Sequence, residues 1–195
     1  MTGLVFPTEE VSTVQPFPPL TVSLPQMLDG ANDQQFRQAI YRIVQAASRM
    51  GDCREGFARE IGLTGNQYLV LMSIAHLQRD EGIGIASVAV HVGLAASHVT
   101  TDVGRLVRKG LLRKRPSPVD KRAVLVSLTS EGEATVHKIS KVIRVVNDIL
   151  FQGISREELE QARIVSEKLV RNSERAIAEL RLIHTRHQFS PDSLE

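Results

Sequence analysis

The sequence has a single cysteine, Cys53, among its 195 residues, so one copy of the chain cannot hold an internal disulfide. No apolar run reaches the roughly 18 residues that a membrane-spanning helix needs. The first residues also lack the basic stretch followed by an apolar run that marks a protein for export. These absences predict a cytoplasmic protein that keeps its thiol reduced and has no membrane role.

Sequence motifs for enzyme chemistry are absent as well. There is no His-Glu-x-x-His, no glycine loop that could cradle a phosphate, no Gly-x-Ser-x-Gly and no pair of carboxylates in a glycine-rich turn. His184 and His187 have a spacing that suits a metal ion, but neither an acidic residue nor a cysteine accompanies them. We therefore expect a protein that is not an enzyme and that uses no metal or cofactor.

Positive charge, by contrast, is concentrated in one segment. The formal net charge is only +2, yet residues 83–128 contain eight Lys and Arg residues against two Asp, which gives this segment +6 and leaves −4 for the rest. Such an asymmetry is typical of a surface that binds nucleic acid. The eight basic residues are Arg105, Arg108, Lys109, Arg113, Lys114, Arg115, Lys121 and Arg122.

The first part of the chain divides into a tail and two helices. Residues 1–32 are expected to be extended and disordered, because five of the eight prolines fall in the first 25 residues and the apolar residues there have no regular period. Asn32 or Asp33 can cap a helix that runs to about Arg59. Thr64 and Gln67 have capping-box spacing and predict the start of the next helix. The first helix is predicted by an apolar stripe at helical spacing, which comprises Phe36, Ile40, Val44 and Ala47.

The second part predicts a helix-turn-helix followed by a β-hairpin. A short helix ends at Gly93, a further helix covers residues 94–109, and an alternating pattern over residues 112–128 indicates a hairpin with a basic tip at residues 116–122. Thr129 precedes one long helix, and the capping box of Ser155 and Glu158 opens another, to about Leu182. The expected fold class is mainly α with a small β-hairpin.

The helix over residues 94–109 has two distinct faces. Val99, Val103 and Leu106 share one side at helical spacing, which predicts a core-facing stripe. The opposite side is short, polar and cationic, and hydroxyl side chains near a helix N-terminus can reach base edges in a major groove. That side comprises Ser97, Thr101, Gly104, Arg105 and Arg108, with His98 and Thr100 flanking it.

Several short stretches resemble the MarR family of transcriptional regulators over residues 34–182. They are Val92-Gly93-Leu94, the run from Arg105 to Leu112, Asp120-Lys121-Arg122, the strand that ends in Ser127-Leu128-Thr129, and Glu131-Gly132. The resemblance implies that the hairpin is a wing, in a winged helix-turn-helix flanked by dimerisation helices. It also implies a homodimer, with residues 33–62 and 130–183 forming the dimerisation region, residues 63–129 the DNA-binding domain and residues 184–195 a C-terminal tail. The helices outside the wing also carry more apolar surface than one winged core could cover, which favours a dimer independently.

The same resemblance implies a regulator, most often a repressor, that binds a pseudo-palindromic operator in double-stranded DNA. Arg122 would enter the minor groove at the wing tip, held there by Asp120. Three departures from the family pattern are present: Ala95 gives up a helix cap, Gly104 stands where a larger polar residue is common, and Thr101 replaces a frequent Arg. The DNA-binding residues expected are Ser97, His98, Thr100, Thr101, Arg105, Arg108, Arg115, Asp120, Lys121 and Arg122.

By the same resemblance, a small aromatic or phenolic acid is the expected effector, with Arg49 for its carboxylate and Tyr68 and Met72 as walls. Two alternatives remain open at this point. One is a winged-helix adaptor that binds proteins and no specific DNA. The other is a redox sensor that uses Cys53, although the reactive cysteine of the redox-responsive relatives lies near the start of the first helix and Cys53 comes late in it.

Overall fold

The computed structural model describes residues 17–78, 80–118 and 123–188. Within these ranges the chain is mainly helical with one small antiparallel sheet, which confirms the expected fold class. The elements are the 3-10 helix η1 (Pro25–Met27), α1 (Gln34–Glu60), α2 (Gly65–Leu77), β1 (Ile83–Gly84), α3 (Ile85–Val92), α4 (Ala96–Arg108), β2 (Leu112–Pro116), β3 (Val124–Leu128), α5 (Ser130–Leu150) and α6 (Arg156–Gln188).

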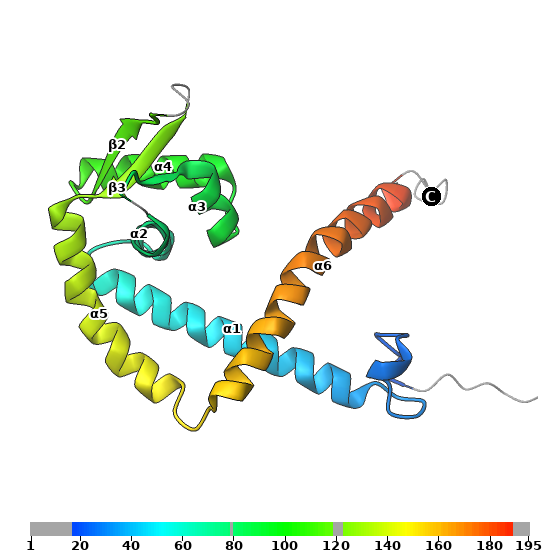
Figure 1. Ribbon diagram of the computed structural model, residues 1–195. Coiled ribbons are helices and arrows are strands. Elements are labelled where there is room, and N and C mark those ends of the chain that lie inside the picture. Colours follow the sequence, from blue (N-terminus) through cyan, green and yellow to red (C-terminus); the bar gives the residue numbers. More distant parts are fainter. Residues whose placement is uncertain (1–16, 79, 119–122, 189–195) are drawn as a thin grey trace, which may run out of the picture. The chain divides into compact units, whose positions relative to one another are not determined.

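Internal contacts divide the chain into two compact units, residues 1–141 and 142–195. The boundary lies inside α5, so the first unit holds the winged region together with α1 and the N-terminal part of α5. In this unit α2, α3 and α4 gather beside the strands β2 and β3 (Figure 1). No helix among the described residues is long and apolar enough to span a membrane.

The core of the first unit is built around α2. This helix is apolar on all sides, and Val70, Leu71 and Ile74 are fully buried in it, as expected for a helix enclosed by its neighbours. Its start follows the expected capping box: the Thr64 hydroxyl accepts from the amide of Gln67, and the Gln67 side chain accepts from the amide of Thr64, both at 3.3 Å. Other fully buried side chains of the first unit include Val88, Val99, Val103, Leu106, Leu112, Val126 and Ile139.

The sheet has three strands in the order β1-β3-β2, all antiparallel. Val126 in the central strand pairs with Ile83 on one side and with Lys114 on the other. The hairpin of β2 and β3 was expected from its alternation. Strand β1 was not, because a two-residue strand is too short to show a period.

Residues 17–33 are more structured than the expected extended tail. Asp33 is 1% exposed, and its carboxylate accepts from both the amide and the hydroxyl of Thr21, at 2.7 and 2.6 Å. Arg37, one turn into α1, forms an ion pair with the other oxygen at 2.5 Å. The hydrogen bonds from Thr21, and after them the charge of Arg37, lower the pKa of Asp33. Asp33 therefore fastens this segment to the start of α1, and Asn32 instead accepts from the amide of Gln34 at 3.0 Å.

The second unit consists of the end of α5 and the long helix α6. Its capping box is present as expected: Glu158 accepts from the amide of Ser155 at 2.8 Å, and the Ser155 hydroxyl accepts from the amide of Glu158 at 3.1 Å. The hydrogen bond from the Ser155 amide to the carboxylate is the largest cause that lowers the pKa of Glu158. The helix continues to Gln188, so residues 184–188, expected to belong to the C-terminal tail, are helical.

Candidate nucleic-acid interface

Helix α4 is placed by a tight turn and a buried face. Gly93 ends α3 in the left-handed region at φ 68°, a conformation that glycine adopts without strain, and the amide of Leu94 bonds back to the carbonyl of Ala89 at 3.2 Å. Val99, Val103 and Leu106 are each 0% exposed, which confirms the expected core stripe. The helix begins at Ala96 without a side-chain cap, since Ala95 precedes it.

The outward face of α4 carries the side chains that the sequence singled out. The hydroxyl of Thr100 donates to the carbonyl of Ala96 at 2.7 Å, and that of Thr101 donates to the carbonyl of Ser97 at 3.0 Å. Each hydroxyl oxygen keeps lone pairs that can accept a further hydrogen bond. A side chain at Gly104 would meet only the end of Arg108, at 3.9 Å. The exposed residues here are Ser97, His98, Thr100, Thr101, Arg105 and Arg108.

One charged residue of α4 lies where the sequence analysis did not place it. Asp102 is only 5% exposed, at the border between the buried stripe and the outward face. Its Oδ1 accepts from Nη1 of Arg105 at 3.1 Å, one turn further along the helix. The spacing of Asp102, three residues after Val99 and four before Leu106, is the signal in the sequence that could have indicated its burial.

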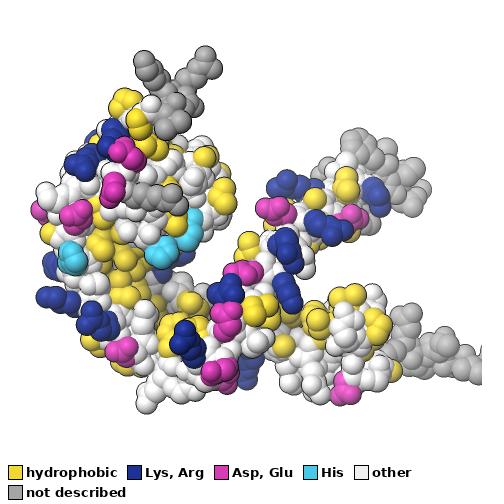
Figure 2. Space-filling model, viewed as in Figure 1, with side chains coloured by type: hydrophobic (Ala, Val, Ile, Leu, Met, Phe, Trp, Pro, Cys, Tyr) yellow, Lys and Arg dark blue, Asp and Glu magenta, His cyan; other side chains and the backbone are white. Residues whose placement is uncertain are grey.

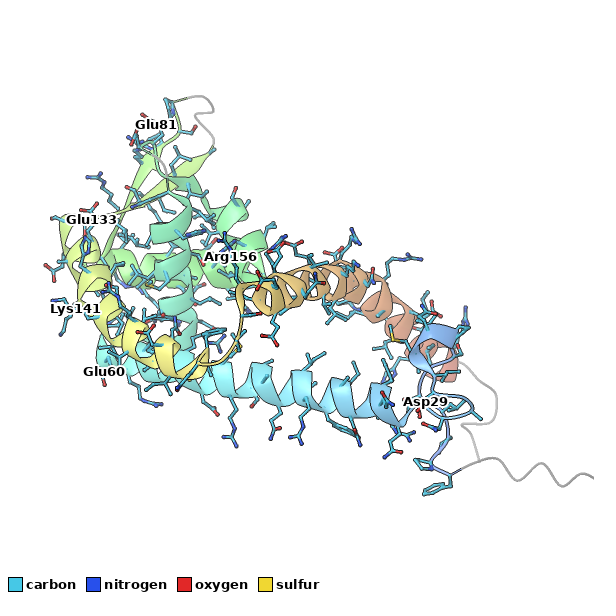
Figure 3. All side chains as sticks on the ribbon, turned by 60° about the horizontal axis from the view of Figure 1, so that its bottom comes forward. Asp29, Glu60, Glu81, Glu133, Lys141 and Arg156 are labelled. Atoms are coloured by element: carbon cyan, nitrogen blue, oxygen red, sulfur yellow. The ribbon has the colours of Figure 1, made fainter. Side chains whose placement is uncertain are left out.

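In the wing, Arg115 is held by the loop that precedes β1. Its Nε donates to the carbonyl of Glu81 at 2.9 Å, and its Nη2 donates to the carbonyl of Asp80 at 3.1 Å and to Oε2 of Glu81 at 2.6 Å. Glu81 lies beside the hairpin (Figure 3). Arg115 was expected to contact DNA, but its recorded bonds tie β2 to the loop. Asp120, Lys121 and Arg122, expected at the wing tip, lie outside the described residues.

The other described basic residues of segment 83–128 differ in whether their side chains form hydrogen bonds within the protein. Lys109 donates to the carbonyl of Gly62 at 3.2 Å, and Arg113 donates to the hydroxyl of Ser127 at 3.0 Å. Arg108 and Lys114 are exposed, and among the described residues no hydrogen bond or ion pair from either side chain is recorded. Arg108, on the outward face of α4, is therefore the cation best placed to meet a phosphate without breaking an existing contact.

The three residues expected to bind a ligand lie in different surroundings. Tyr68 is 8% exposed and packs against Phe57 of α1 with ring centroids 5.9 Å apart, and its burial raises the pKa of its phenol. Met72 is half-buried one turn further along α2. Arg49 is exposed on α1 and pairs loosely with Asp52 at 3.5 Å.

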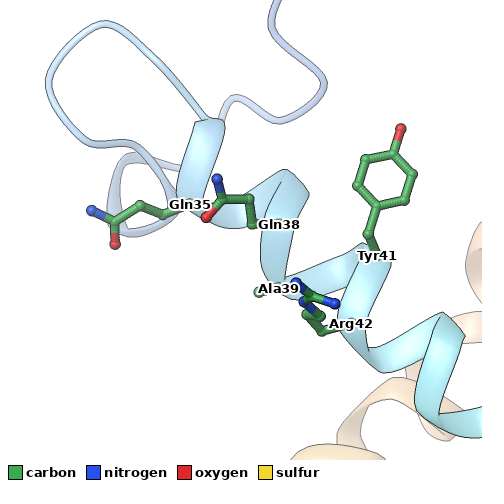
Figure 4. A pocket seen from close by; sticks show the side chains of 5 residues that line it. All are labelled: Gln35, Gln38, Ala39, Tyr41 and Arg42. Atoms are coloured by element: carbon green, nitrogen blue, oxygen red, sulfur yellow. The ribbon is translucent and has the colours of Figure 1, made fainter.

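Two cavities of the first unit involve other residues. One, of about 690 Å³, lies at the N-terminal end of α1 (Figure 4) and is lined by Gln35, Gln38, Ala39, Tyr41 and Arg42. The other, of about 320 Å³, is lined by Glu60, Ile61, Glu131, Ala134, Thr135 and Lys138. Cys53 is half-buried on α1. The described residues contain no group of three or more metal-binding side chains.

Comparison with known proteins gives the same architecture. Residues 55–139 match the family model described as Transcriptional regulator SarA/Rot. A MarR mutant from E. coli in complex with operator DNA is 21% identical, with a TM-score of 0.57 over 69% of this chain and 95% of the other. MosR from M. tuberculosis in complex with DNA is 22% identical, with a TM-score of 0.56 over 71% and 97% of the two chains.

The winged-helix region of this chain is thus similar to the SarA/Rot regulators, and its fold is that of the MarR structures. A third similar structure is CouR from Rhodococcus jostii bound to p-coumaroyl-CoA, which is 25% identical with a TM-score of 0.55 over 63% of this chain and 87% of the other. Within this MarR-type domain, α4 occupies the second position of the helix-turn-helix and β2–β3 form the wing. The matched family consists of transcriptional regulators.

Proposed function

We propose that this chain is a DNA-binding transcriptional regulator, most simply a repressor, that acts as a homodimer on a pseudo-palindromic operator. The observation that carries the proposal is the division of α4 into a buried apolar side and an exposed side of small polar residues and arginines. A helix with short hydroxyl side chains and cations outward can enter a major groove closely, and Gly104 removes bulk at the centre of that side.

Each outward residue has a separate role in this proposal. Ser97 and Thr101, near the N-terminus of α4, read base edges, with His98 and Thr100 beside them. Arg105 and Arg108 contact phosphates, which fixes position without reading sequence. Lys121 and Arg122, with Asp120 to hold Arg122, bind the minor groove. Arg115 takes part indirectly, by keeping the wing against the loop at Glu81.

A homodimer is supported by apolar side chains that one copy leaves exposed. In α1, Tyr41 is 73% and Val44 is 61% exposed, and in α5 Ile149 is 70% exposed. Hydrophobic side chains are also visible along α6 (Figure 2), where Leu159, Leu169, Val170, Ile177, Leu180 and Ile183 are exposed. Soluble proteins rarely leave this much apolar surface uncovered, and a two-fold dimer presents two copies of α4 to successive major grooves.

A small aromatic or phenolic acid is the effector that we propose for release from DNA. The support is the likeness to CouR, bound to p-coumaroyl-CoA, and the aromatic pair of Phe57 and Tyr68 between α1 and α2. A panel of aromatic acids and their CoA thioesters should include one that raises the melting temperature and dissociates the DNA complex. Arg49→Gln should abolish the response. A loss with Arg42→Gln alone would place the site in the cavity of Figure 4 instead.

The DNA proposal is tested by selecting a binding site from a random duplex pool and measuring affinity for it and for random DNA. Ser97→Ala or Thr101→Ala should cost about 1–3 kcal/mol on the selected site and little on random DNA, because base contacts carry specificity. Arg122→Ala should weaken both equally and flatten the salt dependence. Equal losses on both duplexes for Ser97→Ala would remove its role as a base reader.

The oligomeric state needs its own measurement. Sedimentation should give a particle of two chains. The adaptor alternative is tested by DNA binding, because an adaptor would show no salt-dependent affinity for any duplex. A redox sensor would lose its response to oxidants in Cys53→Ser, whereas our proposal expects that variant to respond like the wild type. A protein that sediments as a single chain would contradict the dimer and with it the paired use of α4.

A further inference from the structure

Asp102 is a charged residue in a place where the fold alone favours an apolar one. Its side chain is 7% exposed, next to the fully buried Val99, Val103 and Leu106 of the same helix. Asp is a poor helix former in mid-helix, and burying a carboxylate carries a large desolvation cost. An apolar side chain of similar size would avoid both penalties. The carboxylate therefore calls for a role outside packing.

The partner of Asp102 points to that role. Nη1 of Arg105 lies 3.1 Å from Oδ1 of Asp102, and the Arg105 side chain is 51% exposed. Among the described residues, no other hydrogen bond of this guanidinium is recorded. One edge of the guanidinium is thus held at the border of the core while half of the side chain remains open to solvent. A guanidinium has five donors, so the bond to Asp102 leaves others for a second acceptor.

We propose that Asp102 is a positioning residue that holds the guanidinium of Arg105 ready for a DNA phosphate. The proposal rests on the proposed DNA-binding function and adds a cause for the buried charge. A free arginine side chain samples many rotamers and loses this freedom when it binds. A carboxylate that orders the side chain before DNA arrives removes part of that loss and so strengthens the complex.

Whether replacing Asp102 strengthens or weakens DNA binding distinguishes a positioning role from a purely structural ion pair. Asp102 is a negative charge on the helix that approaches a polyanion, so its removal should strengthen DNA binding if electrostatics alone matter. If Asp102 positions Arg105, its removal should weaken binding despite the gain in positive charge. Asn is nearly isosteric with Asp, so Asp102→Asn changes the charge and leaves the shape almost unchanged.

The experiment measures the affinity of the full chain for a random-sequence duplex by fluorescence anisotropy at several salt concentrations. Asp102→Asn and Arg105→Ala should each weaken binding about three- to tenfold. The double variant should bind no more weakly than Arg105→Ala, because Asp102→Asn weakens and Arg105→Ala removes the same charge-assisted contact. The slope of log affinity against log salt should fall by about 0.9 in Arg105→Ala for the one lost phosphate contact.

Controls keep the outcomes distinct. Glu133→Gln removes an exposed carboxylate on α5 (Figure 3) and should leave binding unchanged or slightly tighter. If Asp102→Asn does not fold by circular dichroism, Asp102→Leu supplies an apolar side chain that can pack in its place, and it too should bind more weakly. Wild-type chain that binds no duplex would refute the proposed function. If the wild type binds DNA, two results would refute the positioning role alone. One is tighter binding by folded Asp102 variants, and the other is additive losses in the double variant.

Discussion

The hydroxyl of Thr129 accepts a hydrogen bond from the amide of Gly132 at 3.0 Å and donates one to the carbonyl of Gly110 at 2.6 Å. The amide of Thr129 also donates to the carbonyl of Leu111 at 3.1 Å. One threonine thus caps α5, ends β3 and binds the turn after α4. These contacts give a physical reason for the Leu-Thr-x-x-Gly sequence by which the chain resembles the MarR family.

Gly132 is the residue of this motif that should be hardest to replace. A Cβ there would lie 2.1 Å from the carbonyl oxygen of Leu111, which is backbone and cannot move aside as a side chain could. We expect Gly132→Ala to lower the free energy of unfolding by about 2 kcal/mol or more, measured by urea denaturation. Gly51→Ala in α1, where a Cβ meets nothing within 4 Å, should raise it by up to about 1 kcal/mol. Equal effects of the two substitutions would contradict the close approach.

Local sequence signals predicted the parts of the fold that depend on neighbouring residues. The capping boxes at Thr64 and Ser155 were both found, because each needs only two residues at fixed spacing. The left-handed stop at Gly93 was found for the same reason. The faces of α4 followed from its period, and the structure places the expected apolar stripe in the core.

Contacts between distant residues could not be predicted in this way. The ion pair of Arg115 with Glu81 joins β2 to another loop, and no local pattern in the sequence links the two. Strand β1 exists because Ile83 pairs with Val126, and Asp33 is buried because Thr21 folds back onto it. Each of these contacts depends on the tertiary fold, and a helical or strand period carries no information about which distant segments meet.

The link between Thr21 and Asp33 should make the N-terminal segment sensitive to acid. Because the pKa of Asp33 is lowered below its ordinary value of 3.8 in the folded chain, its stabilising contribution is complete at pH values above that value. It is lost as the pH falls through the lowered pKa, when the carboxylate takes up a proton. Limited proteolysis of residues 17–33 should therefore accelerate below about pH 4.

A variant gives the matched comparison for this acid effect. Thr21→Val removes the hydroxyl that binds Asp33, so at pH 7 the segment should be cleaved faster than in the wild type. At a pH below the lowered pKa the two proteins should be cleaved at similar rates, because protonated Asp33 has lost much of the advantage of the bond. A difference that persists unchanged in acid would show that Thr21 acts through something other than the charge of Asp33.

Glu55 and Gly65 should behave as one contact. Oε2 of Glu55 in α1 accepts from the amide of Gly65 at the first turn of α2, at 3.2 Å, where a carboxylate is also favoured by the helix dipole. A Cβ on residue 65 would lie 1.8 Å from Oε1 of Glu55 and would displace that flexible side chain. Glu55→Ala and Gly65→Ala should each cost about 0.5–1 kcal/mol of stability, and the double variant should cost little more than either alone. Full additivity in urea denaturation would mean that the two substitutions disturb different interactions.

Arg115 should contribute more to the stability of the wing than to the binding of DNA. Its guanidinium donates to the backbone carbonyls of Asp80 and Glu81 as well as to the Glu81 carboxylate, so a change to Gln should cost about 1 kcal/mol of unfolding free energy. Lys114→Gln on the same strand, where the side chain is exposed, should leave stability within about 0.5 kcal/mol of the wild type. Glu81→Gln should lower the unfolding free energy by less than Arg115→Gln, because it leaves both carbonyl bonds in place. The ion pair itself is partly exposed and contributes little to stability. If Arg115→Gln unfolded like the wild type but bound random duplex more weakly with a shallower salt dependence, the side chain would be a phosphate contact after all, as its place in the basic run first suggested.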